Sequence, residues 1–252
     1  MAIHWTTVLL DFPGADFDAA AGFWTEATGS ALSSPWAEHP EFASLVPAHG
    51  DPYLALQRLG RGEARVHPDF HVEDLAAETE RALALGAAKT GGEPGLVVLA
   101  SPAGLPFCLI VHKEGQSDVP PPTDWNGRAS RLDQICIDVP PEAFDRELAF
   151  WSGFTDWPRS TSDDGEFRRL LPPPGLPVHF LLQHLDSAAP GQDAKAHLDF
   201  SCADVEAETA RHAAVGAVPV RRHRHWQVMR DPVGLEYCLT DKAPDGSWVP
   251  SS

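Results

Sequence analysis

The chain has 252 residues, of which 43% are hydrophobic, and carries a formal net charge of −17. This length accommodates two ordinary domains, each with its own core, and the acidic balance argues against nucleic acid or an anionic membrane surface as a partner. The sequence shows no charged start followed by an apolar run, and no apolar stretch approaches the roughly 20 residues of a membrane span. We therefore expect a cytoplasmic protein.

The first half of the chain alternates between β-rich and helical patterns. Residues 4–12 are β-rich, and Phe17, Ala21 and Trp24 then recur at helical spacing before a stop at Gly29. Proline, glycine and aspartate separate the short β-like runs that follow. The strands predicted there cover residues 42–47, 53–59, 66–72, 96–99 and 107–111.

The second half repeats this alternation. Pro140 and Pro141 mark a helix entry, and Phe144, Leu148 and Trp151 follow at helical spacing. The strands predicted after that helix cover residues 167–171, 178–185, 218–222, 227–229 and 236–240.

One further helix is predicted in each half, after an aspartate suited to an N-cap. The first runs from Asp74 to a stop at Gly86 and the second from Asp204 to a stop at Gly216. The inward positions are expected to be Leu75, Thr79, Ala82 and Leu83 in the first helix and Val205, Thr209 and Ala213 in the second. Pro68 suggests that the strand before the first of these helices lies near a sheet edge.

The two halves are copies of one unit. His67 and His197 are 130 residues apart, as are Gly104 and Gly234, and a nearly constant shift over most of the chain indicates two fused copies. The segment between them is rich in Pro, Gly and Ser without apolar periodicity, which is typical of a linker. We therefore divide the chain into a first domain (residues 1–113), a linker (114–130), a second domain (131–242) and a tail (243–252).

The ordered set of motifs resembles the vicinal oxygen chelate superfamily and its glyoxalase-like branch. Each copy has an H-x-D-F run, at His67 and at His197, and a D/S-P-x-G turn before a last strand that contains F-C-L or Y-C-L. The superfamily includes glyoxalase I, extradiol dioxygenases, and bleomycin and fosfomycin resistance proteins. The resemblance implies an α+β fold of tandem glyoxalase-like domains, each made of two βαβββ modules that form a concave sheet cup. It also implies that the domains pack together within one chain like the dimers of single-domain relatives, in a monomer or a homodimer.

The resemblance further implies four ligand positions in each copy, on the first and fourth strands of each module. In copy one these positions fall on Thr7, Gln57, His67 and Cys108. In copy two they fall on Gln134, Gln183, His197 and Cys238. Metal-using members of the family usually have glutamate at the last position, so both copies depart from that pattern.

These departures bear on whether the chain holds a metal. A divalent ion would act as a Lewis acid and would prefer imidazole and carboxylate ligands, but neither set contains a carboxylate. A cysteine thiolate would favour zinc, whereas a thiol in an apolar strand is more often inert. The candidates for an incomplete site are Gln134, Gln183 and His197. Two expectations for the cofactor therefore remain open: a divalent metal (Zn, Fe, Ni or Mn) or no cofactor. The missing carboxylates favour the second.

A second group of candidates is the His–Asp pair of each copy. Residues two apart in a strand share a face, so His67 lies beside Asp69 and His197 beside Asp199. Such a pair is either a general base with the carboxylate that orients it or a buried pair that stabilises the strand by hydrogen bonding. With His71 on the same face, copy one also has part of a two-histidine, one-carboxylate iron site.

A basic run distinguishes copy two. Strand alternation would place Arg222, Arg224 and Trp226 on one face, where they would contact an anionic or aromatic ligand. The alternative is a solvated edge strand protected by its charges.

Two functions of different class remain open. The first is a protein that binds a small organic molecule in its cups without a metal, of a drug-sequestering or resistance type. The second is a divalent-metal-dependent lyase, isomerase or dioxygenase with its active cup in domain 2; a metal-independent enzyme lies between the two. None of the four cysteines forms a C-x-x-C pair, so all four are expected to be reduced thiols in strands.

Overall fold

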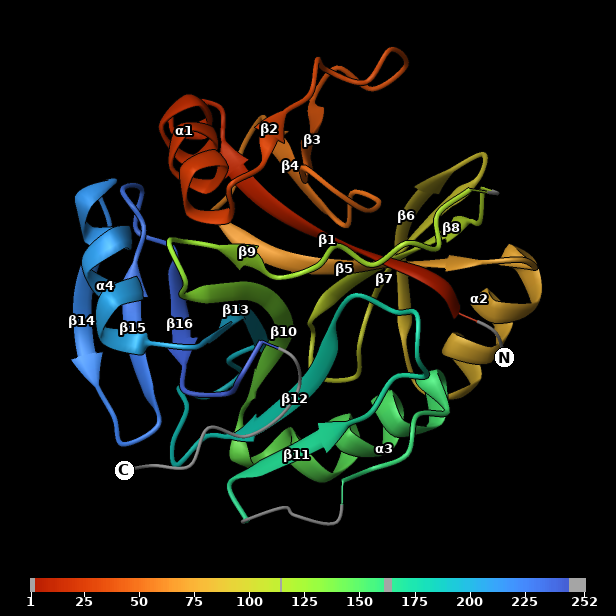
Figure 1. The fold of residues 1–252 in the computed structure, drawn as a ribbon. Coiled ribbons are helices and arrows are strands. Elements are labelled where there is room, and N and C mark those ends of the chain that lie inside the picture. The colour runs from red at the N-terminus through yellow and green to blue at the C-terminus, as the bar shows by residue number, and fades with distance from the viewer. Residues whose placement is uncertain (1–2, 114, 161–164, 245–252) are drawn as a thin grey trace. The chain divides into compact units, whose positions relative to one another are not determined.

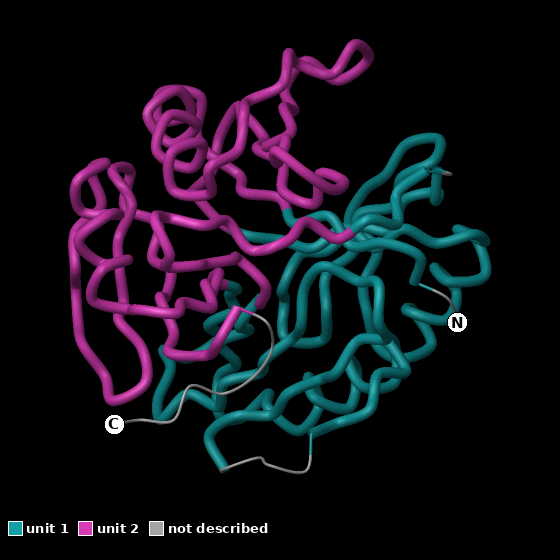
Figure 2. Tube along the Cα trace, viewed as in Figure 1, with its two compact units in different colours: residues 1–8, 66–118, 135–196 teal, residues 9–65, 119–134, 197–252 magenta. Residues whose placement is uncertain are grey.

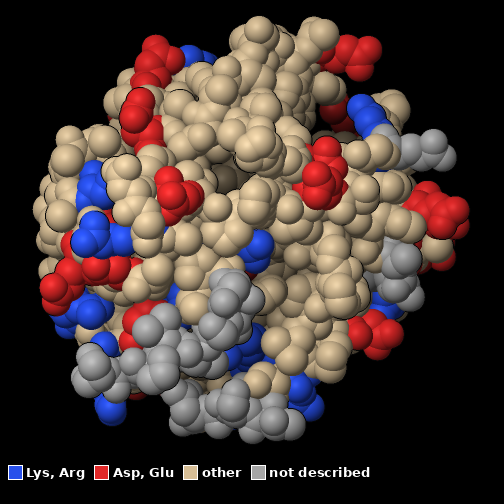
Figure 3. All heavy atoms as spheres, viewed as in Figure 1, with Lys and Arg blue, Asp and Glu red and all other residues tan. Residues whose placement is uncertain are grey.

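The computed structural model describes residues 3–113, 115–160 and 165–244 of the chain (Figure 1). Strands dominate these residues, and none of their helices is long and apolar enough to cross a membrane. On the face shown in Figure 3, acidic and basic side chains are interspersed over a mostly uncharged surface. The strong negative charge is therefore not gathered into one continuous patch on that face.

Copy one folds as two complete βαβββ modules, as expected. Its elements are β1 (Ile3–Pro13), α1 (Phe17–Thr28), β2 (Ala31–Leu32), β3 (Phe42–Val46), β4 (Leu54–Leu59), β5 (Arg65–Val72), α2 (Leu75–Ala84), β6 (Ala88–Glu93), β7 (Leu96–Ala100) and β8 (Pro106–Val111). The strands form one sheet in the order β2-β3-β4-β1-β5-β8-β7-β6. Because β5 lies between β1 and β8, the edge position expected from Pro68 was wrong.

Copy two follows the same order, but among the described residues its first module has two strands after the helix rather than three. Its elements are β9 (Thr123–Asp124), β10 (Ala129–Val139), η1 (Pro141–Ala143), α3 (Phe144–Thr155), β11 (Phe167–Leu170), β12 (His179–His184), β13 (Lys195–Cys202), α4 (Val205–Ala214), β14 (Val218–Arg222), β15 (Trp226–Arg230) and β16 (Glu236–Thr240). The strand order is β11-β12-β10-β13-β16-β15-β14, and β9 pairs with β10. The segment expected to be a linker therefore contains a short strand, because β9 falls within residues 114–130.

The chain packs as two compact units, each of which draws on both copies (Figure 2). Unit 1 comprises residues 1–8, 66–118 and 135–196, and unit 2 comprises residues 9–65, 119–134 and 197–252. Unit 1 thus combines the second module of copy one with the first module of copy two, and unit 2 combines the other two modules. The domain boundaries at residues 113 and 131 follow the sequence repeat and remain a prediction.

Each unit has an aromatic core on the helix side of its strands. In unit 1 the ring of Phe70 on β5 lies 6.0 Å from that of Trp151 and 5.4 Å from that of Phe154, both on α3 (centroid distances). In unit 2 the ring of Trp24 on α1 lies 5.2 Å from that of Tyr237 on β16. The helical spacing that predicted α1 and α3 therefore identified their buried faces correctly, since Trp24 and Trp151 are fully buried.

The helix ends follow local rules that the sequence already indicated. The side chain of Asp74 accepts a hydrogen bond from the N–H of Ala77, and Asp204 accepts one from the N–H of Ala207, so both aspartates are N-caps. At the other ends, Gly86 and Gly216 have φ of 107° and 111°, a conformation that glycine adopts without strain.

An arginine closes the C-terminus of a neighbouring helix in each unit. In unit 1, Arg81 of α2 donates to the carbonyl oxygen of Gly153 near the end of α3. In unit 2, Arg211 of α4 donates to the carbonyl oxygens of Glu26 and Ala27 near the end of α1 (3.0 and 2.7 Å). A cation is favourable there because the last carbonyls of a helix carry partial negative charge. The repeat therefore preserves a helix–helix contact as well as a strand pattern.

The inward faces of α2 and α4 differ from the predicted ones. Leu83 is 41% exposed, and Ala213 is also exposed, although both were expected to face inward. On α4 the buried positions after Val205 are Glu208 and His212. Hydrophobic spacing missed this face because polar residues form it.

Candidate functional site

The polar residues of β5 lie on the sheet face that carries no helix. Phe70 points into the core under α3, so by alternation His67, Asp69 and His71 point to the other face. These three side chains are nevertheless buried, with relative exposures of 6%, 8% and 5%. Buried polar groups on a face without a helix need hydrogen-bond partners from the sheet or from a ligand. We call this helix-free surface, which carries His67, Asp69 and His71, the open face of copy one.

His67, Asp69 and Cys108 form a compact cluster on the open face of copy one. Asp69 on β5 is the register partner of Cys108 on β8, and Nε2 of His67 lies 3.3 Å from Oδ1 of Asp69. One ligand atom from each residue lies within 4.8 Å of the other two. Burial, and next the charge of Asp69, raise the pKa of the Cys108 thiol to about 11, although His67 acts in the opposite direction. The thiol is therefore protonated in the metal-free protein.

Histidines continue along the same face of unit 1. Oγ1 of Thr7 lies 2.8 Å from Nε2 of His71, in hydrogen-bonding contact. The ring of His112 stacks on that of His4 at 4.6 Å, and lies 6.3 Å from that of His71. Burial lowers the pKa of His71 to about 4, with Asp69 opposing and His112 and Lys113 adding to the shift. His112 was not among the expected site residues, although alternation from Cys108 along the chain would have placed it on this face.

The equivalent face of copy two is arranged differently. Nε2 of Gln134 donates a hydrogen bond of 2.5 Å to Oδ2 of Asp199, and Nε2 of His197 lies 3.4 Å from Oδ1 of Asp199. Asp199 pairs in register with Cys238. Among the described residues, Oε1 of Gln134 and Oδ1 of Asp199 are buried without a hydrogen-bond partner. The structure therefore brings together four predicted residues: Gln134, His197, Asp199 and Cys238.

The two remaining family positions, Gln57 and Gln183, do not belong to these clusters. Gln57 on β4 pairs in register with Phe42 and belongs to unit 2, whereas Thr7, His67 and Cys108 belong to unit 1. Gln183 on β12 belongs to unit 1, and its Nε2 donates to Oε1 of Glu166 at 2.7 Å. The amide of Gln183 is therefore already engaged with a carboxylate.

The basic run of copy two lies in a hairpin. Because β14 ends at Arg222 and β15 begins at Trp226, these residues do not share one strand with Arg224, and strand alternation across them was the wrong argument. Instead the ring of His223 stacks on that of Trp226 at 4.4 Å, and Arg222 and Arg224 are exposed. Since β14 is the last strand of its sheet, its charges lie on an edge strand.

The family-type positions do not fit a manganese or iron ion. Such ions need imidazole and carboxylate ligands, and these positions supply one imidazole per copy with neutral amide, hydroxyl or thiol groups. The hydroxyl of Thr7 is already in contact with His71, and the amide nitrogen of Gln134 with Asp199. No anionic oxygen at these positions offsets the desolvation of a dication.

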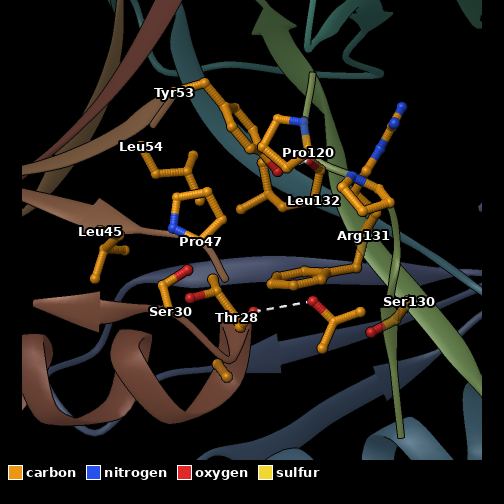
Figure 4. Close-up of a pocket in the computed structure, with 14 residues that line it drawn as sticks. Thr28, Ser30, Leu45, Pro47, Tyr53, Leu54, Pro120, Ser130, Arg131 and Leu132 are labelled. Carbon is orange, nitrogen blue, oxygen red and sulfur yellow. Dashed lines mark hydrogen bonds between the residues drawn. The ribbon is translucent and has the colours of Figure 1, made fainter. Parts of the chain in front are cut away.

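A small cavity in unit 2 is separate from both clusters (Figure 4). Its volume of about 30 Å³ holds one or two water molecules, far less than an organic ligand needs. The residues that line it are Ala27, Thr28, Ser30, Leu45, Pro47, Tyr53, Leu54, Pro120, Pro121, Thr123, Ser130, Arg131, Leu132 and Phe200. At its wall, the hydroxyl of Tyr53 donates a hydrogen bond to the carbonyl oxygen of Leu132. Because its volume is so small, this cavity is a packing defect rather than a ligand site.

A buried polar network supports unit 2. Glu208 accepts hydrogen bonds from Nη2 and Nε of Arg211 (2.6 and 3.0 Å) and from the hydroxyl of Ser130 (2.5 Å). Nδ1 of His212 lies 2.8 Å from the hydroxyl of Tyr237. Burial acts to raise the pKa of Glu208, but hydrogen bonds from His212, Arg211 and Ser130 outweigh it and lower the pKa to about 2. The i, i+4 spacing of Glu208 and His212 was the available signal for this network.

Comparison with known proteins identifies the family to which most of the chain belongs. A sequence model of a family described as glyoxalase-like domain matches twice, over residues 7–110 and 134–240. A search of curated proteins found no match.

Three solved structures illustrate the fold. A Mn(II)-bound glyoxalase from Novosphingobium aromaticivorans is 17% identical, with 93% of this chain and 80% of that chain covered and a TM-score of 0.63. A mutant 4-hydroxymandelate synthase from Streptomyces coelicolor is 15% identical, with 92% and 90% covered and a TM-score of 0.61. The 2,2',3-trihydroxybiphenyl 1,2-dioxygenase from Sphingomonas wittichii is 14% identical, with 93% and 88% covered and a TM-score of 0.60. At these identities the likeness concerns the fold.

Proposed function

Because this chain belongs to the glyoxalase-like domain family in both of its copies, we propose that it binds a small polar organic molecule on the open face of copy two. In this proposal the ligand contacts Gln134, His197 and Asp199, and no family-type metal ion is required. A drug-sequestering or resistance role is one use of such binding. None of the four buried cysteines forms a disulfide, which supports a reducing, cytoplasmic location.

One observation carries the proposal. Oε1 of Gln134 and Oδ1 of Asp199 are buried acceptors without a hydrogen-bond donor among the described residues. A buried polar atom left without a partner costs about 1–3 kcal/mol, and a ligand with two donors would remove that cost at both atoms. Asp69 in copy one repeats the feature, since its Oδ1 is likewise without a hydrogen bond within the described part of the chain.

The alternative function is an enzyme with its active site in copy two. A metal-dependent lyase, isomerase or dioxygenase would use Gln134, Gln183 and His197 around a divalent ion, and the Mn(II)-bound glyoxalase favours this class as a structural relative. The existing hydrogen bonds of both amides to carboxylates argue against it. A metal-independent enzyme would instead use His197 as a general base oriented by Asp199, 3.4 Å away.

Thermal-shift measurements on the full chain in the presence of EDTA test the proposal. The probes are catechol and 4-hydroxymandelate, followed by a panel of small hydroxy acids and hydroxylated aromatics. A ligand at 100 times its Kd stabilises the folded protein by about 2.7 kcal/mol, which corresponds to a Tm increase of about 5–10 °C for a chain of this size. We expect a shift of this size for at least one compound, with quenching of tryptophan fluorescence.

Matched variants locate the site. Asp199→Asn and Gln134→Ala should reduce the shift, whereas Asp69→Asn changes the equivalent residue of copy one and should leave it unchanged. Stoichiometric manganese or iron that is lost in His197→Ala, together with turnover of a probe, would replace binding with the enzymatic alternative. A shift that survives in all three variants would show that the ligand binds elsewhere.

A further inference from the structure

Two groups of buried polar side chains are neighbours on the open face of copy two. The first is the pair of Gln134 and Asp199, and the second surrounds the carboxylate of Asp133. Ser201 joins them, because it lies two residues after Asp199 on the same face of β13 and donates to Oδ1 of Asp133 at 2.6 Å. We propose that the ligand of copy two is a zwitterion, whose ammonium group contacts Asp199 and Gln134 and whose carboxylate contacts Arg131. This inference rests on the proposed function and names the chemical class of its ligand.

The first group calls for a positively charged donor. Nε2 of Gln134 donates to Oδ2 of Asp199, while Oε1 of Gln134 and Oδ1 of Asp199 are buried acceptors without a donor in the described part of the chain. A buried carboxylate costs free energy unless its charge is offset. An ammonium group brings both the N–H donors and the opposite charge, which a hydroxyl group does not. The side chain of His197, beside Asp199, is 19% exposed, so solvent reaches this end.

The second group carries more positive than negative charge. Oδ2 of Asp133 lies 2.9 Å from Nζ of Lys242 and 3.8 Å from Nη2 of Arg131, so one carboxylate faces two cations. Nε of Arg131 is buried and has no hydrogen-bond partner among the residues that the structure describes. The guanidinium points away from the small cavity (Figure 4), and its side chain is 19% exposed. A ligand carboxylate would supply the missing negative charge and match the planar guanidinium with two oxygens.

The spacing of the two groups sets the length of the ligand. Asp199 and Ser201 are two residues apart on one strand, which corresponds to about 7 Å. The carboxylate of Asp133 lies at the Ser201 end, because it accepts the hydroxyl of that serine. The ammonium and carboxylate groups of the ligand are therefore separated by a chain of several carbons, as in an ω-amino acid, rather than joined through one carbon as in glycine.

Copy one shares only the acceptor end of this arrangement. Oδ1 of Asp69 is likewise buried without a hydrogen-bond partner within the described residues. Counted with the repeat shifts of 127 residues in the first module and 130 in the second, the positions of Arg131 and Lys242 are occupied by His4 and His112. An arginine guanidinium keeps its charge over the whole physiological pH range, whereas an imidazole does not. The zwitterion site therefore belongs to copy two.

Isothermal titration calorimetry of the full chain in the presence of EDTA tests the ligand class. The probes are 5-aminopentanoate, pentylamine and pentanoate, which each keep one end, and glycine, which is too short. We expect 5-aminopentanoate to bind about tenfold or more tightly than the other three, since each lost charged hydrogen bond costs about 1.5–3 kcal/mol. Arg131→Met keeps the pair of Asp133 and Lys242. It should weaken 5-aminopentanoate about tenfold and leave pentylamine unchanged, whereas Asp199→Asn should weaken both amines.

Asp69→Asn is the matched control from copy one and should leave all affinities unchanged, with circular dichroism confirming that each variant is folded. Equal affinities for 5-aminopentanoate and either pentylamine or glycine would overturn the inference, as would unaltered binding of 5-aminopentanoate by Arg131→Met. Binding of catechol or 4-hydroxymandelate that is lost in Asp199→Asn, without binding of 5-aminopentanoate, would overturn the zwitterion and leave the proposed function standing. Absence of binding by every probe of both panels would overturn both.

Discussion

Removing the charge of Glu208 should destabilise unit 2 strongly. Its side chain is 5% exposed and pairs with Arg211, which is 19% exposed. Hydrogen bonds lower its pKa from 4.5 to about 2, and at about 1.4 kcal/mol per pKa unit this corresponds to roughly 3 kcal/mol of stability at neutral pH. We expect Glu208→Gln to lower the free energy of unfolding by about this amount, measured by urea denaturation at pH 7.

The pH dependence gives the reasoning a second test. Because the folded-state pKa lies below the unfolded value, the carboxylate stabilises fully above about pH 4.5, and this contribution disappears as the pH falls through about 2. The stability difference between wild type and Glu208→Gln should therefore shrink between pH 4.5 and pH 2.5. Glu78 is the equivalent residue of copy one, 17% exposed and 3.4 Å from Arg81, so Glu78→Gln should cost less than about 1 kcal/mol. A difference for Glu208→Gln below 1 kcal/mol at pH 7, or one independent of pH, would refute this account.

Three further predictions concern features that the two copies share. Asp74→Ala and Asp204→Ala should each lower the free energy of unfolding by about 1 kcal/mol, because each removes an N-cap; chemical denaturation measures this. Gly104 and Gly234 both have positive φ (87° and 100°), but only at Gly104 would an added Cβ meet a neighbour, Asp193. Gly104→Ala should therefore lower Tm more than Gly234→Ala, and equal losses would show that backbone strain alone matters. All four cysteines are buried and none forms a disulfide, so the native protein should not react with a thiol reagent until urea unfolds it, whereupon four thiols should appear.

The fold could be predicted because its local signals agree with one another. Asp74 and Asp204 cap helices as expected, and the spacing of Phe17, Ala21 and Trp24 identified the buried face of α1. These features depend on a few neighbouring residues. The Gly-containing strand β6 was missed because the sequence AKTGGE has little intrinsic strand preference and each of its residues is exposed.

The candidate site could be predicted only in part, for physical reasons. Strand alternation correctly grouped His67 with Asp69 and His197 with Asp199. It could not show that Gln134 donates to Asp199 while Thr7 contacts His71, since those contacts join strands far apart in the sequence. The polar inner face of α4 was missed for the same reason. Burial of Glu208 depends in part on a hydrogen bond from Ser130, which lies far from it in the sequence.

The composition of the compact units limits how this protein can be divided. Since each unit is assembled from one module of either copy, a truncated protein ending in residues 114–130 would retain half of each aromatic core and expose the rest to water. A single copy would have to exchange modules with a second molecule to bury the same aromatic cores. Joining the two copies in one chain makes this exchange intramolecular, and the copies differ at the open faces, where Thr7 and His71 stand in place of Gln134 and Ser201.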